Sequence, residues 1–151
     1  MRVVELALIA TLLVLLYATL STKTVSPKLS LKNDYILLRE EAYSLARLIA
    51  DSEILPHILF TTDESGTSIE RSREEIESIL RVLITALAPP NVEFKVIIRE
   101  LDYATGTEVL KASTETEGFS MVTVAATALV VFTDSLHSRI YVIEVAVGRV
   151  V

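Results

Sequence analysis

The feature that most limits what this chain can fold into lies in its first twenty-one residues. Val3–Ser21 reads VVELALIATLLVLLYATLS, and Glu5 is its only charged residue. At the 1.5 Å rise of an α-helix, a segment of this length crosses about 30 Å, the thickness of a hydrocarbon layer. Such a helix would be apolar all round, so it has to be buried in lipid or among similar helices. We therefore expect residues 1–22 to form a hydrophobic assembly or transmembrane helix.

Three interpretations of this segment compete. A cleaved signal peptide requires a basic start and a site of small residues, but the segment offers only Arg2 and no convincing site between Tyr17 and Thr22. A simple membrane anchor fits the length. The third interpretation, a helix that packs with copies of itself, depends on Glu5, because charged residues inside membrane helices are costly and usually functional.

The residues Met1-Arg2-Val3-Val4-Glu5-Leu6, followed by an apolar stretch, resemble the mature N-terminus of type IV pilins, a family that includes archaeal pilins and pseudopilins. In that family a Glu at the fifth position precedes a hydrophobic helix that packs in the filament core. The resemblance implies that the amine of residue 1 in an adjacent subunit neutralises Glu5, because a buried carboxylate requires a cation. The implied assembly residues are Met1, Glu5, Leu6, Leu8, Ile9, Leu12, Leu13, Leu15, Leu16 and Leu20.

The middle of the chain predicts a linker and two amphipathic helices. The polar residues 23–33, with Pro27 among them, are expected to be a linker before an extracytoplasmic domain at 34–151. Asp34 is a good N-cap for a helix from about Tyr35 to Ser52. After a loop, the pattern Thr67-x-x-Glu70 is a capping box for a second helix that ends at Pro89.

After Asn91 the period of the apolar residues changes from 3.6 to 2, which indicates β-strands. Alternation over 92–98, a hairpin connection at 102–107 and a short strand near 109–112 are followed by apolar strands at 119–133 and from 139 towards 151. The predicted fold class is α+β: a long N-terminal hydrophobic helix, two amphipathic helices and a four-stranded antiparallel β-meander. This plan is pilin-like at the level of architecture.

The segment Phe119–Thr133 is unusual because both of its faces are apolar or small. Such a strand is expected to be covered on both sides. It is either a central strand between the two helices, which is the simpler interpretation, or a strand covered by helices on one side and by a neighbouring subunit on the other.

Composition argues against several classes of function. With 14 Lys and Arg against 20 Asp and Glu, the net charge of −6 does not suit nucleic acid or anionic lipid head groups. No Cys is present, which excludes disulfides and thiolate sites. Asp134-Ser135-Leu136-His137 contains the residue types of a catalytic triad, but this short spacing in a turn favours capping. We expect no enzyme activity, no cofactor, no metal and no small-molecule substrate.

The chain has no Gln and only two Asn. Such a low amide content is typical of proteins from thermophiles and suggests an archaeal source. The sequence thus predicts a structural subunit of an extracellular, cell-surface type IV pilin-like filament with a role in adhesion. Its partners would be copies of itself, and it would be inserted in the membrane before assembly. The alternative is a single-span membrane-anchored extracytoplasmic domain that is an accessory component of an envelope or secretion complex.

Overall fold

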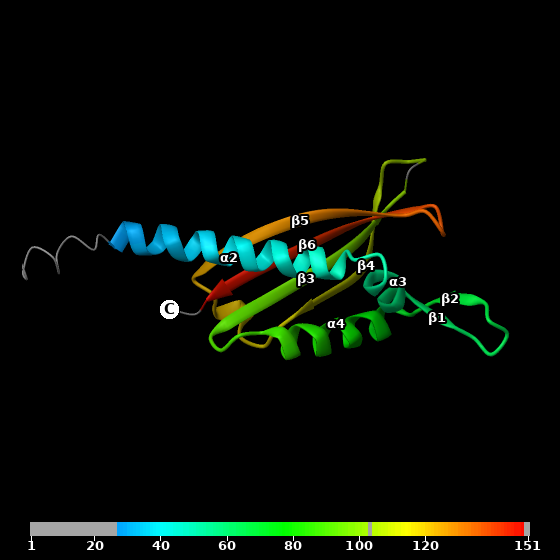
Figure 1. Ribbon diagram of the computed structural model, residues 1–151, viewed down its shortest axis with the longest axis horizontal. Coiled ribbons are helices and arrows are strands. Elements are labelled where there is room, and N and C mark those ends of the chain that lie inside the picture. Colours follow the sequence, from blue (N-terminus) through cyan, green and yellow to red (C-terminus); the bar gives the residue numbers. More distant parts are fainter. Residues whose placement is uncertain (1–26, 103, 150–151) are drawn as a thin grey trace, which may run out of the picture. The chain divides into compact units, whose positions relative to one another are not determined.

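A computed structural model describes residues 27–102 and 104–149 of the chain, and side chains from residue 33 onward (Figure 1). The chain divides into two compact units, Met1–Asp34 and Tyr35–Val151. The elements, in chain order, are α2 (Pro27–Ile49), α3 (Ile54–Leu59), β1 (Phe60–Thr62), β2 (Ser68–Glu70), α4 (Arg73–Leu87), β3 (Val92–Leu101), β4 (Glu108–Glu115), the 3₁₀ turn η1 (Phe119–Met121), β5 (Val124–Asp134) and β6 (Arg139–Arg149).

The first expected amphipathic helix is present, with different ends. Helix α2 spans Pro27–Ile49, so that residues 27–33 of the predicted linker are helical. From Tyr35 onward its apolar residues recur at helical spacing and are buried in the core: Leu38, Ala42, Leu45, Ala46 and Ile49. The helix ends before residue 52, because the chain turns there into the short helix α3.

The second helix uses a different capping box from the one predicted. Ser72 caps α4 by accepting from the backbone N–H of Glu75, while the Glu75 carboxylate accepts from the N–H of Ser72. The predicted box at Thr67 and Glu70 is wrong, because Ser68–Glu70 pairs with Phe60–Thr62 as a small antiparallel hairpin. Gly66, with φ of 82°, allows the turn of that hairpin.

The predicted fold class is wrong in its topology. The four main strands form one antiparallel sheet in the order β4-β3-β6-β5, whereas a meander would place them in chain order. In the described part of the chain, no helix is long and apolar enough to cross a membrane. The long hydrophobic helix expected at 1–22 lies outside the described residues, and the pilin-like plan is therefore not supported.

Two glycines lie at the crossing that sets this strand order, and the fit is tight at Gly148. The segment 116–123 carries the chain from β4, at one edge, past the ends of β3 and β6 to β5, at the other edge. A Cβ on Gly148 would collide with the Val122 side chain and come close to the Val124 carbonyl oxygen, and one on Gly118 would collide with the Glu93 carboxylate. Because Gly148 has no Cβ, the crossing segment can lie directly against the end of β6, whereas at Gly118 only the end of the Glu93 side chain would have to move.

The core lies on one face of the main sheet, beneath α2 and α4 (Figure 1). Alternate residues of β3 and β6 point into it, from Val92 to Ile98 and from Tyr141 to Val147. No α-helix covers the opposite face in the part of the chain that the structure describes, and only the short turn η1 lies against it, with Phe119 beside Lys95; we call it the open face. The expectation that the strand at 119–133 is central is wrong, because β5 is an edge strand and its open-face residues Leu129 and Val131 are 58% and 61% exposed.

Candidate functional site

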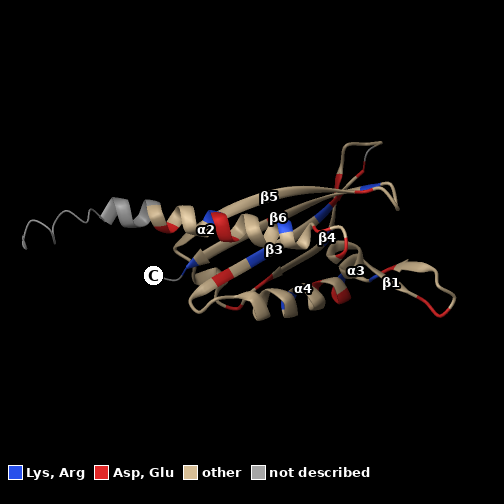
Figure 2. Ribbon diagram, in the orientation of Figure 1, with Lys and Arg blue, Asp and Glu red and all other residues tan. Residues whose placement is uncertain are grey.

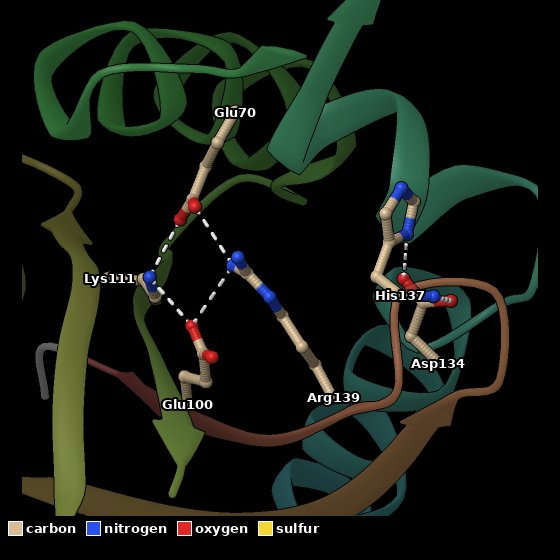
Figure 3. A network of polar contacts seen from close by, with 6 residues as sticks. All are labelled: Glu70, Glu100, Lys111, Asp134, His137 and Arg139. Carbon is tan, nitrogen blue, oxygen red and sulfur yellow. Dashed lines mark hydrogen bonds and ion pairs between the residues drawn. The ribbon is translucent and has the colours of Figure 1, made fainter. Parts of the chain in front are cut away.

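Four charged side chains from four different strands meet at one end of the main sheet (Figure 3). The Lys111 ammonium donates to the carboxylates of Glu70 and Glu100, each at 2.6 Å. The Arg139 guanidinium lies 2.8 Å from Glu70 and 3.3 Å from Glu100. These contacts close a ring of alternating charge, which we call the ion-pair ring.

A bulge in the sheet brings Lys111 into this ring. The pairing of β3 with β4 shifts by one residue between Ile98 and Arg99, since Ile98 faces Ala112 while Arg99 faces Leu110. Lys111 is the extra residue and has no partner across the strand. In a bulge the two residues opposite one partner can point to the same side, so Lys111 shares the buried side with Ala112 and reaches Glu70.

Mutual attraction keeps the ring charged. Burial alone would raise the pKa of Glu70, but hydrogen bonds from Lys111 and Arg139 outweigh it and lower that pKa below its ordinary value. Burial would likewise lower the pKa of Lys111, yet the carboxylates of Glu100 and Glu70 raise it. The hydrogen bond to Glu70 also raises the pKa of Arg139. Two cations and two anions are thus paired with one another.

The turn between β5 and β6 stands beside the ring. Asp134 Oδ1 accepts from the backbone N–H groups of Leu136 and His137, and Asp134 Oδ2 lies 2.6 Å from His137 Nδ1. Burial would raise the pKa of Asp134, but these contacts with His137 and Leu136 lower it. The capping role predicted for this turn is confirmed by the geometry.

The strand β1 is fixed against this turn by its aromatic ring. Phe60 stacks on His137 with ring centroids 4.1 Å apart and an interplanar angle of 13°. The Arg139 guanidinium lies 5.9 Å from the Phe60 centroid, within the range of a cation–π contact. Together with Glu70, which belongs to β2, these contacts fasten the small hairpin to the main sheet.

A cleft of about 790 Å³ opens next to the ring, bordered by Lys111, Arg139 and the turn residues Asp134, Ser135 and Ser138. Its charged side chains already bind one another or the turn. Among residues 27–102 and 104–149, no group of three or more His, Asp or Glu is placed to hold a metal ion. The arrangement can hold two sheets together, and no residue described in it is placed as an activated nucleophile with a base.

The ion-pair ring was not predicted from the sequence, although one signal for it exists. Alternation in β3 puts Val96 and Ile98 on the buried side, and the next residue on that side is Glu100. Arg139 likewise precedes the buried Tyr141 by two residues. A charged residue at a position that alternation assigns to the core predicts a buried partner. The partner itself, Glu70, could not be identified from a local pattern.

The residues predicted to act in assembly lie outside the described part of the chain. These are Met1, Glu5, Leu6, Leu8, Ile9, Leu12, Leu13, Leu15, Leu16 and Leu20.

The described part of the chain carries a set of exposed apolar side chains that the sequence analysis did not single out. On α2, Tyr35, Ile36, Leu37 and Tyr43 are between 44% and 51% exposed. Exposed apolar groups gathered on a domain mark surfaces that contact other molecules.

We compared the chain with models of known protein families, with functionally characterised proteins and with solved structures, and none of the three comparisons gave a match.

Proposed function

We propose that this chain is a structural subunit of an extracellular filament of the type IV pilin kind, assembled through residues 3–21. The observation that carries the proposal is the composition of that segment: nineteen consecutive residues whose only charge is Glu5. The order of the strands lends the proposal no support, because it differs from the expected meander.

Glu5 gives the proposal its mechanism. A carboxylate in an apolar environment is stable only beside a cation or when protonated. In a filament core, the amine at residue 1 of the adjacent subunit would be that cation, as the resemblance to pilins implies. One such contact per subunit, repeated by the same rotation and translation, generates an open helical array.

The described domain is compatible with this role. Its ion-pair ring is internally neutralised and holds the β1–β2 hairpin in place. Its exposed apolar residues on α2 and on the open face of β5 offer surface for contacts between subunits.

Electron microscopy of material sheared from the cell surface, combined with mass spectrometry of the subunit's first residue, tests the proposal. We expect filaments whose subunits begin with Met1 carrying a modified amine. Recovery of the chain only from detergent-solubilised membranes would contradict the proposal and favour the membrane-anchored alternative.

The variant Glu5→Ala tests the mechanism. We expect it to reduce filament yield at least tenfold while the domain retains its circular dichroism spectrum. Glu64→Ala, in the exposed hairpin loop, is the matched control and should leave the yield unchanged. Normal yield from Glu5→Ala would remove the role assigned to this carboxylate.

A further inference from the structure

The free edge of the main sheet at β5 carries no charge over almost its whole length. From Val124 to Thr133 the strand reads VAATALVVFT, with no Asp, Glu, Lys, Arg or Pro. Figure 2 shows the strand in tan up to Asp134 at its end. Every second residue of an edge strand directs its backbone N–H and C=O away from its only neighbour, here β6. A long, uncharged edge of this kind is a template for another strand.

The other edge of the same sheet, β4, is protected. Glu108, Lys111 and Glu115 place charges along it, and Lys111 is the bulged residue of the ion-pair ring. The outward-pointing N–H of Ser113 donates to the Glu77 carboxylate of α4 at 3.0 Å. Charges, a bulge and a side-chain cap are the devices that proteins use to block unwanted pairing. Since this fold has those devices on one edge, their lack on β5 is specific to that edge.

A groove runs beside β5, and it is lined by the charged residues Arg39 and Glu40 as well as by apolar side chains. It has a volume of about 530 Å³ and lies between α2 and residues 127–129 of the strand. Tyr35, Ile36 and Tyr43 line it and are 47%, 44% and 51% exposed. Aromatic and aliphatic groups alongside a free strand edge provide the side-chain contacts that accompany main-chain pairing.

We propose that β5 pairs antiparallel with β5 of a second copy of this chain, which joins two four-stranded sheets into one continuous sheet of eight strands. A two-fold axis through Leu129 pairs all eleven residues of the strand, with Val124 opposite Asp134 of the second copy. The interface is isologous, so the same patch serves both copies. The proposal goes beyond the filament assembled through residues 3–21 and does not depend on it.

The charge pattern makes β5 the surface at which two copies of this chain can meet. Each chain carries a net charge of −6, so two copies repel one another over most of their surfaces. At β5 they meet without a like-charge pair within the ten uncharged residues. Thr127 and Val131 of one copy then face Val131 and Thr127 of the other, which gives β-branched cross-strand pairs. The two-fold axis repeats each of these side-chain pairs on both sides of Leu129, so that one set of contacts serves both copies.

Single cysteines test the pairing in the full chain in mild detergent, because the natural sequence contains none. Five open-face positions of β5 are exposed and are replaced one at a time by Cys: Ala125, Thr127, Leu129, Val131 and Thr133. A disulfide requires Cα atoms about 4.4–6.8 Å apart, which antiparallel pairing provides only near the two-fold axis. We expect oxidation to give covalent dimer mainly from Leu129→Cys. The other four positions lie two or four residues from the axis along the strand, and we expect little dimer from them.

Two controls separate edge pairing from other association. Ala146→Cys lies on the open face of β6, and edge pairing keeps its two copies about 20 Å apart, because three strand spacings and four residues along the strand separate them. It cross-links only if open faces stack on one another. Val109→Cys, 51% exposed on β4, reports random collision and association through residues 3–21. Dimer that forms at Ala146 or Val109 as readily as at β5, or at none of the five β5 positions, overturns the proposal.

A charge on the edge should prevent pairing. Leu129→Lys introduces a cation at a position that is 58% exposed, and Val109→Lys is the matched control on β4. We expect Leu129→Lys to reduce cross-linking at least tenfold in a chain that carries both Thr127→Cys and Val131→Cys, two positions that face one another across the axis, and Val109→Lys to leave it unchanged. If filaments form and no β5 position cross-links, the β5 pairing is disproved and the filament proposal stands. If β5 cross-links and no filaments form, the filament proposal is disproved and the β5 pairing stands.

Discussion

The two edges of the main sheet differ in how they are closed. At β4, the cap from Glu77, the ion pairs of Lys111 and the pair between Lys95 and Glu115 at 3.1 Å surround the strand with bound charge. At β5, the ten residues from Val124 to Thr133 include no charged side chain. A single sheet therefore contains both a guarded and an unguarded edge, and the proposed pairing of β5 accounts for this difference.

The open face repeats this difference. Near β4 it is covered by charged side chains, since Arg99 contacts Glu144 at 2.9 Å and Glu108 at 3.6 Å. Near β5 it presents Leu129 and Val131, both more than half exposed. Polar groups on one half and apolar groups on the other direct any contact with another molecule to the β5 half.

The largest expected effect comes from breaking the crossing that places β4 and β5 on opposite edges. In Gly148→Val the new side chain collides with Val122 and with the backbone near Val124. We expect a loss of about 3 kcal/mol in the free energy of unfolding, at the upper end for an overpacked site. Urea unfolding of the full chain in detergent, followed by circular dichroism, measures it.

The control for this substitution is the second glycine of the crossing. In Gly118→Ala the new methyl group meets only the end of the Glu93 side chain, which can turn away. We expect its cost to stay below about 1 kcal/mol. Equal costs at both glycines would show that contact with the Val124 backbone does not fix the crossing.

A smaller effect is expected from removing the cap on the guarded edge. Glu77→Ala leaves the N–H of Ser113 without its partner and also removes the contact with Arg73. Loss of a partly buried hydrogen bond to a charged group costs about 1–2 kcal/mol. Hydrogen exchange at Ser113 should accelerate, while Glu77→Gln, which keeps an acceptor oxygen, should restore much of the protection. Unchanged exchange in Glu77→Ala would show that this edge is closed by other contacts.

The smallest effect is expected from acid, which weakens the guarded side through the ion-pair ring. The pKa of Glu70 is lowered in the folded chain, so its contribution to stability is present above the ordinary value of 4.5 and is lost as the pH falls through the lower folded value. The protection of the β1–β2 hairpin against hydrogen exchange, taken relative to the intrinsic exchange rate at each pH, should therefore decrease below pH 4.5.

Other carboxylates titrate in the same range, so a variant is required to isolate Glu70. The difference in unfolding free energy between the natural chain and Glu70→Gln should shrink on going from pH 7 to pH 3, and should be smaller in high salt. A difference that does not change with pH would exclude Glu70 as the group responsible.

Local patterns predicted most of the described elements. The spacing of Leu38, Ala42 and Leu45 predicted a helix, the alternation from Val92 to Ile98 predicted a strand, and Asp134 was assigned to a capped turn. Each of these depends on neighbours within four residues. The capping box predicted at Thr67 and Glu70 was wrong, because the pairing of Ile69 with Thr61 places this segment in a hairpin, which no local pattern shows.

The ion-pair ring and the role of each edge were beyond such patterns. Glu70 and Arg139 are 69 residues apart in the chain, and only the docking of the β1–β2 hairpin brings them together. Alternation shows which face a strand presents but not which strand lies next to it. For this reason β5 was expected in the centre of the sheet and is found at its edge.

The sequence by itself determined the apolar segment at 3–21, the two amphipathic helices and the four main strands, because periodicity and charge are local properties. The tertiary structure alone decided that β3 and β6 are central, that Lys111 bulges into the ion-pair ring and that β4 is capped. It also decided that β5, the least charged strand of the main sheet, lies at an open edge. Strand order depends on contacts between distant segments, and here the absence of a Cβ on Gly148 permits the close crossing that sets it.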